Sequence, residues 1–230
     1  MVKIFCVNTQ TSMTFPEGTA LIDMLPAFEF EKPYPILCAK VNNVSQGLKY
    51  RAFNSRKVEF LDYTSYIGRS VYCNSLCFLL CKAAKDVFPN CRVVLRRPIS
   101  KGYFCSISKG DGGEMTSADL ELIKARMNEL VEADIPFRRH EVLLEEAIGL
   151  FRSLGYEDKV KLLETSGDVY VNYYTLEDTP DYYYEALLSS TGYLKVWSLV
   201  MYRGGMLLRV PSRPKPEQLA PFVEQPKTFD

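Results

Sequence analysis

The chain has 230 residues, of which 47% are hydrophobic and 24% are charged, a composition that excludes a disordered or low-complexity protein and allows one large domain or two modest ones. Its 28 basic residues equal its 28 acidic residues, so no overall positive charge indicates a nucleic-acid partner, and any such binding must depend on local patches. The sequence begins without the features of a signal peptide and contains no apolar run of the ~18 residues that a membrane span needs, so we expect a cytoplasmic protein with no membrane partner.

The first sixty residues have the pattern of a small sheet with one short helix. Expected strands cover residues 2–7, 12–15, 36–41 and 57–61, which are joined by turn-prone residues. Thr19 is a suitable N-cap for a helix over residues 20–25, and Pro26 is expected to end that helix. We therefore predict an N-terminal domain over residues 1–63.

After about residue 70 the spacing of the apolar residues becomes helical. Helices are expected over residues 70–87, 117–131, 143–154 and 158–163. Thr116 and Asp119 have the spacing of a capping box at the start of the second of these helices, and Gly155 stands where a left-handed C-cap would end the third. Residues 169–210 are rich in Tyr, Val and Leu, which favours an antiparallel sheet. Together these elements predict an α+β domain over residues 70–211.

The cysteines and the end of the chain add two further expectations. The seven cysteines include no C-x-x-C pair, which favours reduced and buried thiols over a disulfide framework. Prolines recur among polar residues over 212–230, a composition typical of an exposed tail or linker.

Several short stretches point to a known family. Residues 15–19 read FPEGT ahead of the short helix, which resembles the strand-to-helix junction of the TGS domain at the front of threonyl-tRNA synthetases. Later stretches follow in the order of the second additional domain (SAD) of those synthetases, their editing domain: PISKGYF (98–104), MTSADL (115–120), DKVKLLE (158–164) and STGYLK (190–195). The resemblance covers nearly all of residues 1–211. It implies an N-terminal β-grasp (ubiquitin-like) domain, then a larger α+β domain of the synthetase editing type with an antiparallel sheet.

The resemblance is closer still to the N-terminal half of bacterial uridine kinase-like nucleoside kinases, which carry a similar pair of domains ahead of a P-loop kinase domain. The sequences around PISKGYF, DKVKLLE and STGYLKV carry this resemblance. The sequence contains no G-x-x-x-x-G-K-[ST], so this chain has no loop to hold a triphosphate. The likeness therefore implies a C-terminal kinase domain in a longer parent chain, or a stand-alone version of its N-terminal half.

The resemblance also gives the positions at which catalytic residues should stand. In the synthetase editing domain, two His four residues apart on the first long helix meet a Cys and a His four residues apart near the end. Counting back from Pro89 puts Phe78 and Lys82 at the first pair, and counting back from residues 190–192 puts Tyr183 and Leu187 at the second. None of these four side chains is a suitable metal ligand or proton carrier at neutral pH.

We therefore expect no catalytic residue, no metal and no cofactor in this chain. Phe78, Lys82, Tyr183 and Leu187 could instead line a pocket for an aromatic ring that carries phosphate or carboxylate. Ordinary packing of the strands is the alternative interpretation.

Cysteine and histidine leave two further alternatives. Cys73, Cys77 and Cys81 recur every four residues, so they could hold Zn²⁺ with a fourth ligand or could pack as small buried thiols. The single histidine, His140, stands in a charged stretch that we expect to be a loop, where a lone imidazole is more typical of a surface residue than of a general base.

Basic residues suggest where RNA or phosphate would bind. The candidates lie around the strand expected near residue 92 and in the stretch after the second helix: Arg92, Arg96, Arg97, Lys101, Arg138 and Arg139. Guanidinium groups near aromatic rings suit phosphates and stacked bases, provided that the fold brings the two groups together. A solvated charged face is the alternative.

Three functions remain open on the sequence alone. The first, which we favour, is a non-catalytic module that recognises tRNA-like RNA or a nucleotide and regulates an attached nucleoside kinase. The second is a divergent aminoacyl-tRNA deacylase, and the third is a protein-interaction module that uses the sheet surface of its N-terminal domain.

Overall fold

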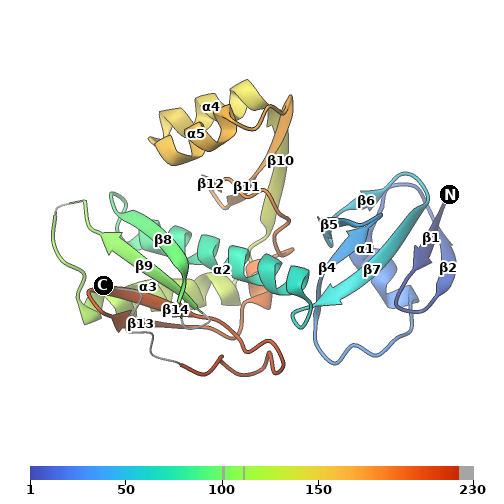
Figure 1. The fold of residues 1–230 in the computed structure, drawn as a ribbon, viewed down its shortest axis with the longest axis horizontal. Helices are drawn as coiled ribbons and strands as arrows, with labels where there is room; N and C mark the ends of the chain where they lie inside the picture. Colours follow the sequence, from blue (N-terminus) through green and yellow to red (C-terminus); the bar gives the residue numbers. More distant parts are fainter. Residues whose placement is uncertain (100–101, 111, 223–230) are drawn as a thin grey trace.

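The fold is α+β, as the sequence predicts, with sheets in which every strand pair but β1–β7 is antiparallel among the described residues, and it has three parts (Figure 1). The structure is a computed structural model that describes residues 1–99, 102–110 and 112–222. An N-terminal unit leads into a central unit of helices on a sheet, and a smaller unit projects from the central one. Over those described ranges, no helix combines the length and the apolar character needed to cross a membrane.

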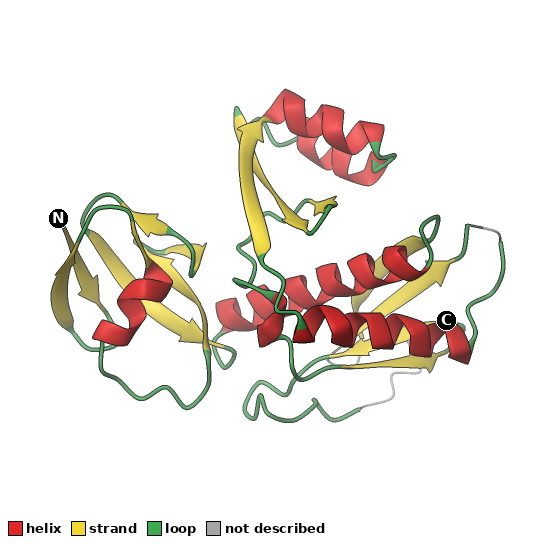
Figure 2. Cartoon of the chain, turned by 180° about the vertical axis from the view of Figure 1, so that it is seen from behind, coloured by secondary structure: helices red, strands yellow, loops and turns green. Residues whose placement is uncertain are grey.

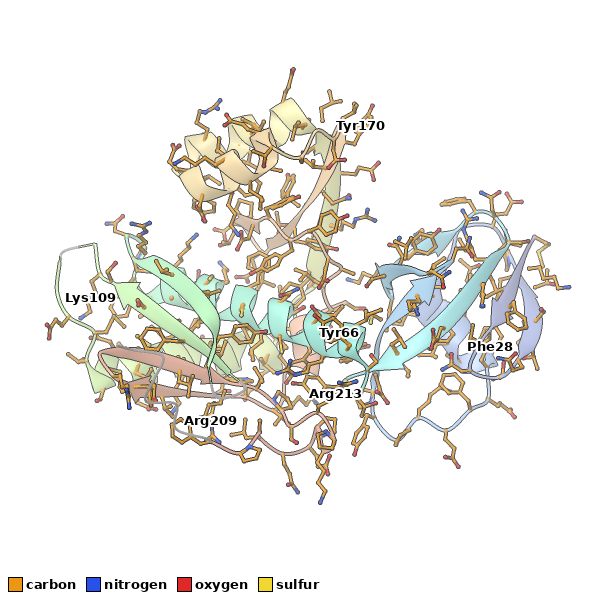
Figure 3. The ribbon with its side chains drawn as sticks, viewed as in Figure 1. Phe28, Tyr66, Lys109, Tyr170, Arg209 and Arg213 are labelled. Carbon is orange, nitrogen blue, oxygen red and sulfur yellow. The ribbon has the colours of Figure 1, made fainter. Side chains whose placement is uncertain are left out.

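The N-terminal unit has a five-stranded sheet, a two-stranded sheet formed by β3 and β6, and a short helix. Its strands are β1 (Val2–Cys6), β2 (Thr11–Phe15), β3 (Thr19–Ala20), β4 (Ile36–Val41), β5 (Val44–Gly47), β6 (Arg51–Ala52) and β7 (Arg56–Asp62), and its helical turns are α1 (Leu21–Met24) and η1 (Leu25–Ala27). The sheet order is β2-β1-β7-β4-β5, with β1 and β7 parallel. Phe28, labelled in Figure 3, is fully buried in the core of this unit together with Ile4 and Met24. The unit therefore has a hydrophobic core of its own.

The predicted N-cap at Thr19 is wrong. Thr19 lies in β3 opposite Ala52, and its hydroxyl donates to the carbonyl of Pro16 at 2.7 Å. Helix α1 begins only at Leu21 and has no side-chain cap. Its first N–H groups instead donate to carbonyls of a distant segment, Leu21 to Tyr50 and Ile22 to Leu48, at 3.0 and 2.9 Å. Tertiary pairing thus supplies the partners that a local cap would have given.

The central unit packs two long helices on a four-stranded antiparallel sheet (Figure 2). Its elements are α2 (Tyr66–Val87), β8 (Arg92–Ile99), β9 (Gly102–Ser108), α3 (Ser117–Glu132), η2 (Thr191–Tyr193), β13 (Ser198–Tyr202) and β14 (Gly205–Arg209). The sheet order is β13-β14-β9-β8, and residues such as Leu76, Ile123 and Leu208 are buried in the shared core. The predicted capping box is confirmed, because Thr116 and Asp119 bond reciprocally at the start of α3.

A short link, residues 63–65, joins β7 of the N-terminal unit to α2 of the central unit. Ser65 caps α2 by accepting from the backbone N–H of Gly68 at 2.9 Å. A Cβ atom at Gly68 would lie 1.9 Å from the carbonyl oxygen of Asp62. Only glycine therefore allows the last residue of β7 to approach the first turn of α2 so closely.

The projecting unit has its own small core. It consists of β10 (Phe137–Leu143), α4 (Leu144–Ser153), α5 (Glu157–Glu164), β11 (Tyr170–Leu176) and β12 (Thr179–Asp181), with sheet order β10-β11-β12. Phe151, Leu163 and Val171 are buried between its helices and strands. Gly155 has φ +73° after α4, so the predicted left-handed C-cap is confirmed. Tyr170, labelled in Figure 3, marks the outer tip of this unit.

The region from 169 to 210 differs from the single antiparallel sheet that we expected. Strands β11 and β12 belong to the sheet of the projecting unit, whereas β13 and β14 belong to the central sheet. Residues 182–197 between them contain bends, an isolated bridge at Ser190 and η2, but no strand. The tyrosines of this segment give it β-propensity, yet Tyr182 and Tyr183 pack against two different cores and Tyr184 is exposed, so they form no ladder.

The end of the described chain returns to the central unit instead of extending as a tail. Ala220 donates its N–H to the carbonyl of Val210 at 3.0 Å, and Arg209 donates from Nη2 to the carbonyl of Ala220 at the same distance. Arg213, labelled in Figure 3 near the junction of β7 and α2, donates to the carbonyl of Thr64 at 2.7 Å. Of the predicted linker, residues 212–222 are thus held against the fold, and 223–230 lie outside the described residues.

Candidate functional site

The aromatic residues at the expected catalytic positions pack against each other. Phe78 on α2 is fully buried, with its ring centroid 5.6 Å from that of Tyr183 and 5.8 Å from that of Phe137. Burial raises the pKa of Tyr183 well above its ordinary value, so its hydroxyl stays protonated. These rings therefore form part of the core between α2 and the projecting unit.

Lys82, one turn further along α2, is engaged in an ion-pair network. Its side chain is only 4% exposed. The ammonium lies 2.7 Å from Asp86, 2.8 Å from Asp178 and 3.3 Å from Glu177. Burial lowers the pKa of Lys82, but the hydrogen bonds to the carboxylates outweigh burial and the net direction is upward. With three carboxylates around three N–H donors, Lys82 joins α2 to the β11–β12 turn and has no donor left for a ligand.

The four expected pocket residues lie in different surroundings. Phe78, Lys82 and Tyr183 line neither of two large cavities in the described structure. Leu187 is buried and lines the second cavity. Of the four residues, Leu187 therefore borders the second cavity, whereas the rings of Phe78 and Tyr183 contact each other and Lys82 contacts carboxylates.

In the cysteine row on α2, Cys73 and Cys77 are buried and Cys81 is partly buried. Burial raises the pKa of the Cys81 thiol to about 12 and that of Cys77 well above its ordinary value, and it also raises that of Cys73. A thiol with a raised pKa is a poor nucleophile and a poor metal ligand. Within the described ranges, no group of three or more His, Cys, Asp and Glu side chains has the arrangement to hold a metal ion.

A cleft between the N-terminal unit and β10 has the properties of a binding site. We call it the basic cleft; its volume is about 950 Å³, and it is lined by residues 46–51 and 53 from the N-terminal unit and by 136–141, 174 and 187–189 from the other side. Figures 1 and 2 show β10 on the side of the projecting unit that faces the N-terminal unit. The cleft is within the range of volumes typical of ligand sites.

Positive side chains outnumber negative ones at the basic cleft. Lys49, Arg51, Arg138 and Arg139 line it together with one acid, Glu141. Among the described residues, only Arg139 of these four cations makes an ion pair, at 3.8 Å to Glu141, a surface contact of little energy. Partial burial lowers the pKa of Lys49, and the charge of Arg138 lowers it further against the opposing effect of Asp134. Two cations from different units therefore repel each other at the cleft, which a bound anion would relieve.

The floor of the basic cleft holds a buried polar atom without a partner. Ser189 is 6% exposed, and its hydroxyl has no hydrogen-bond partner in the part of the chain that the structure describes. Leaving a buried hydroxyl unsatisfied costs about 1–3 kcal/mol. Because the oxygen itself is buried, a ligand in the cleft would remove that cost only if the side chain turned to present its hydroxyl.

His140 lies in strand β10, so the expectation of a loop there is wrong. Its Nε2 is 2.9 Å from the hydroxyl of Thr175 on the paired strand β11, and its ring stacks on Tyr173 with centroids 4.8 Å apart. His140 lines the basic cleft, but its Nε2 is occupied by threonine. The imidazole is thus positioned as part of the wall.

The predicted basic residues separate into two places. Arg92 is exposed on β8, which belongs to the central sheet, whereas Arg138 and Arg139 lie on β10 in the other sheet. Arg96 and Arg97 belong to β8, but their side chains fall outside the described part of the structure, as does Lys101 altogether. The fold therefore joins Arg138 and Arg139 to Lys49 and Arg51 of the N-terminal unit.

Lys49, Arg51 and Ser189 gave no signal in the sequence. They are far apart along the chain and stand in no recognisable motif, so only the docking of the N-terminal unit beside β10 brings them together. A surplus of cations in an otherwise neutral chain becomes visible only in three dimensions.

No protein-family model matches the chain. The chain is 28% identical to the threonine–tRNA ligase of Desulforamulus reducens over 89% of its own length and 32% of that ligase. It is 26% identical to the ligase of Geobacter sp. (strain M21) over 82% of its length and 29% of that ligase, and 32% identical to that of Syntrophotalea carbinolica over 73% and 26%. The chain spans a third or less of the length of these curated relatives, and it is similar to a region of threonine–tRNA ligases over most of its own length.

Proposed function

We propose that this chain binds RNA of the tRNA type at the basic cleft and does not cleave it. The observation that carries the proposal is the surplus of positive side chains from two units around one cavity, beside the unsatisfied hydroxyl of Ser189. Phosphates would neutralise the cations, and the exposed ring of Phe53 at the same cleft offers a stacking surface for a base. The similarity to ligases that act on tRNA gives the RNA its class.

The local chemistry supports binding without hydrolysis. At the positions to which the resemblance assigns catalysis, Phe78 and Tyr183 pack together and Lys82 is saturated by carboxylates. The nearby thiols have raised pKa values, and the imidazole of His140 bonds Thr175. Activation of a water molecule needs a base or a metal within hydrogen-bond reach of the scissile bond, and none of these groups supplies one.

The assignment of the domains is part of the same proposal. The sheet order β2-β1-β7-β4-β5, with its parallel central pair and helix α1, supports a β-grasp domain in the N-terminal unit. The similarity to threonine–tRNA ligases supports an editing-type domain in the remainder. A module that recognises tRNA would act in the cytoplasm.

A kinase domain in a longer parent chain is a separate part of the proposal, which the PISKGYF, DKVKLLE and STGYLKV stretches support. Reading the coding frame beyond residue 230 tests this part alone. A P-loop a short way downstream would support it, and its absence would remove the regulatory role while leaving RNA binding in place.

The RNA-binding proposal is tested by titrating a fluorescently labelled tRNA transcript with the chain and following anisotropy. We expect binding that is strong at about 50 mM salt and much weaker at about 200 mM, because phosphate contacts release counterions. In parallel, seryl-tRNA is incubated with the chain and the release of serine is measured; no acceleration over buffer is expected. Absence of binding at low salt would contradict recognition, and turnover would contradict the loss of catalysis in favour of a divergent deacylase.

A further inference from the structure

A second large cavity lies on a different part of the molecule. We call it the aromatic pocket; its volume is about 830 Å³, and it is lined by residues 34, 35, 37, 63, 72, 128, 131, 132, 134, 192–197, 211, 216 and 217. Its walls come from the chain before β4, from the beginning of α2, from the end of α3, from the η2 loop and from the returning end of the chain. It shares no lining residue with the basic cleft, so it requires an explanation of its own.

The floor of the aromatic pocket is fixed by two buried tyrosines. The hydroxyl of Tyr63 donates to the carbonyl of Pro211 at 2.9 Å. The hydroxyl of Tyr72 donates to the carbonyl of Val196 at 3.0 Å and accepts from the backbone N–H of Val196 at 3.1 Å. The two rings meet edge to face, with centroids 5.0 Å apart. The floor therefore connects the link after β7, helix α2, the η2 loop and the end of the chain, and it is already organised for a ligand.

Further aromatic rings and carboxylates stand around this floor. Tyr34, Tyr193 and Trp197 are half-buried in the wall, and the charged lining residues are Glu132, Asp134, Glu217 and Lys195. Within the ranges that the structure describes, none of these four charged side chains forms an ion pair. Asp134 accepts a hydrogen bond from the N–H of Gly192 at 2.9 Å. Its negative charge also acts to raise the pKa of Lys49 at the neighbouring cleft. The lining thus holds three acids against one base.

Two tyrosines lie close to these carboxylates, at two separate places in the aromatic pocket. Burial and the nearby Glu217 raise the pKa of Tyr34. Burial and the nearby Asp134 raise the pKa of Tyr193. Each tyrosine–carboxylate pair offers a ring and a charge to the same ligand group, the combination by which proteins recognise ammonium and guanidinium groups. The two pairs stand on different segments of the chain.

We propose that the aromatic pocket binds a small organic cation with two or more amino groups on an aliphatic chain, a diamine or polyamine. The lining disfavours an anion, because it carries three carboxylates and one ammonium. The aromatic and aliphatic lining, including Trp197 and Leu37, suits the methylene chain between the amino groups. The volume is within the range that small-molecule sites occupy. This site and the RNA site are independent, so either can fail without the other.

The test uses Trp197, which is the only tryptophan in the chain and lines the pocket, so intrinsic fluorescence reports on this site. The full chain is titrated with 1,6-diaminohexane and spermidine, and with 1,6-hexanediol as a neutral probe of matched length. We expect a saturable fluorescence change with the two amines and none with the diol. Equal responses to diamine and diol, or no saturable response to either amine, would overturn the proposal.

Charge variants make the test specific. Glu132→Gln and Glu217→Gln are each expected to weaken diamine binding by about two- to fivefold, and Lys195→Gln to strengthen it. Glu145→Gln, on the exposed face of α4, is the matched control and should leave binding unchanged. All four changes are isosteric or conservative on exposed side chains, and circular dichroism checks that each variant folds. Unchanged diamine affinity in the Glu132→Gln/Glu217→Gln double variant would refute the site.

Discussion

Removing the two cations that crowd each other at the basic cleft should weaken RNA binding and flatten its dependence on salt. The double variant Lys49→Gln/Arg138→Gln takes one positive charge from each unit and leaves Arg51 and Arg139 in place. Lys49 and Arg138 are exposed and make no ion pair in the described part of the chain, so the variant should fold as the wild type does.

The magnitude follows from counterion release. Each phosphate contact contributes a slope of about −0.9 to the logarithm of affinity against the logarithm of salt for a duplex, and about −0.7 for a single strand. The four lining cations thus predict a slope of about −2.8 to −3.6 for the wild type, and the variant should lose about 1.4 to 1.8 of it. With equal affinities at about 1 M salt, this difference in slope makes the affinity of the variant at about 0.1 M salt about 25- to 60-fold lower than that of the wild type.

Fluorescence anisotropy of a labelled tRNA at four or more salt concentrations measures both quantities. The matched control is Lys3→Gln/Lys161→Gln, which removes the same net charge from exposed positions on β1 and α5 that line neither cavity. If the control loses as much affinity and slope as the cleft variant, RNA binding depends on overall charge and the basic cleft is not the site. An unchanged slope in the cleft variant leads to the same conclusion.

Four further predictions concern the site and the stability of the fold. Ser189→Ala should lower RNA affinity by about two- to tenfold and not lower the melting temperature, because the hydroxyl has no partner in the described structure; lost stability with intact binding would make its role structural. Lys82→Met should destabilise the fold by about 1–2 kcal/mol in urea unfolding, since three carboxylates lose their cation but are themselves partly exposed, whereas Lys124→Met at a surface pair should change stability by less than about 0.5 kcal/mol. Hydrogen bonds from Lys109 and Thr116 lower the pKa of Asp119 to about 2, so the stability that the capping box contributes is present above pH 4 and is lost as the pH falls towards 2; the difference in melting temperature between wild type and Asp119→Asn should narrow over that window. Finally, iodoacetamide at about pH 8 should leave Cys77, Cys81 and Cys105 unmodified in the native protein, as mass spectrometry can show, because burial keeps these thiols protonated.

Local sequence rules predicted the parts of the fold that depend on local physics. The apolar spacing identified helices α2 to α5, and the capping residues Thr116 and Asp119 and the C-cap Gly155 lie where their chemistry requires. The rules failed where distant segments decide the outcome. Thr19 pairs with β6 instead of capping α1, and residues 137–143 form a strand because β11, some thirty residues later, supplies the ladder.

The candidate site was predictable only in part. Arg138 and Arg139 stood out as a local pair of guanidinium groups, but counting from motifs could not reveal that the rings of Phe78 and Tyr183 contact each other. Lys49 belongs to another unit, and its proximity to Arg138 follows from how two separately folded cores dock. No pattern of spacing within either unit contains that information.

The close approach at Gly68 has a mechanical consequence for the basic cleft. The carbonyl of Asp62 fits against the first turn of α2 only because residue 68 lacks a side chain, and this contact lies at the joint between the unit that carries Lys49 and the rest of the molecule. Adding a single methyl group there would force the joint apart and change the distance between the two walls of the cleft, 46–53 and 136–141. The smallest possible substitution at a position that touches no ligand would thus alter how wide the cleft opens.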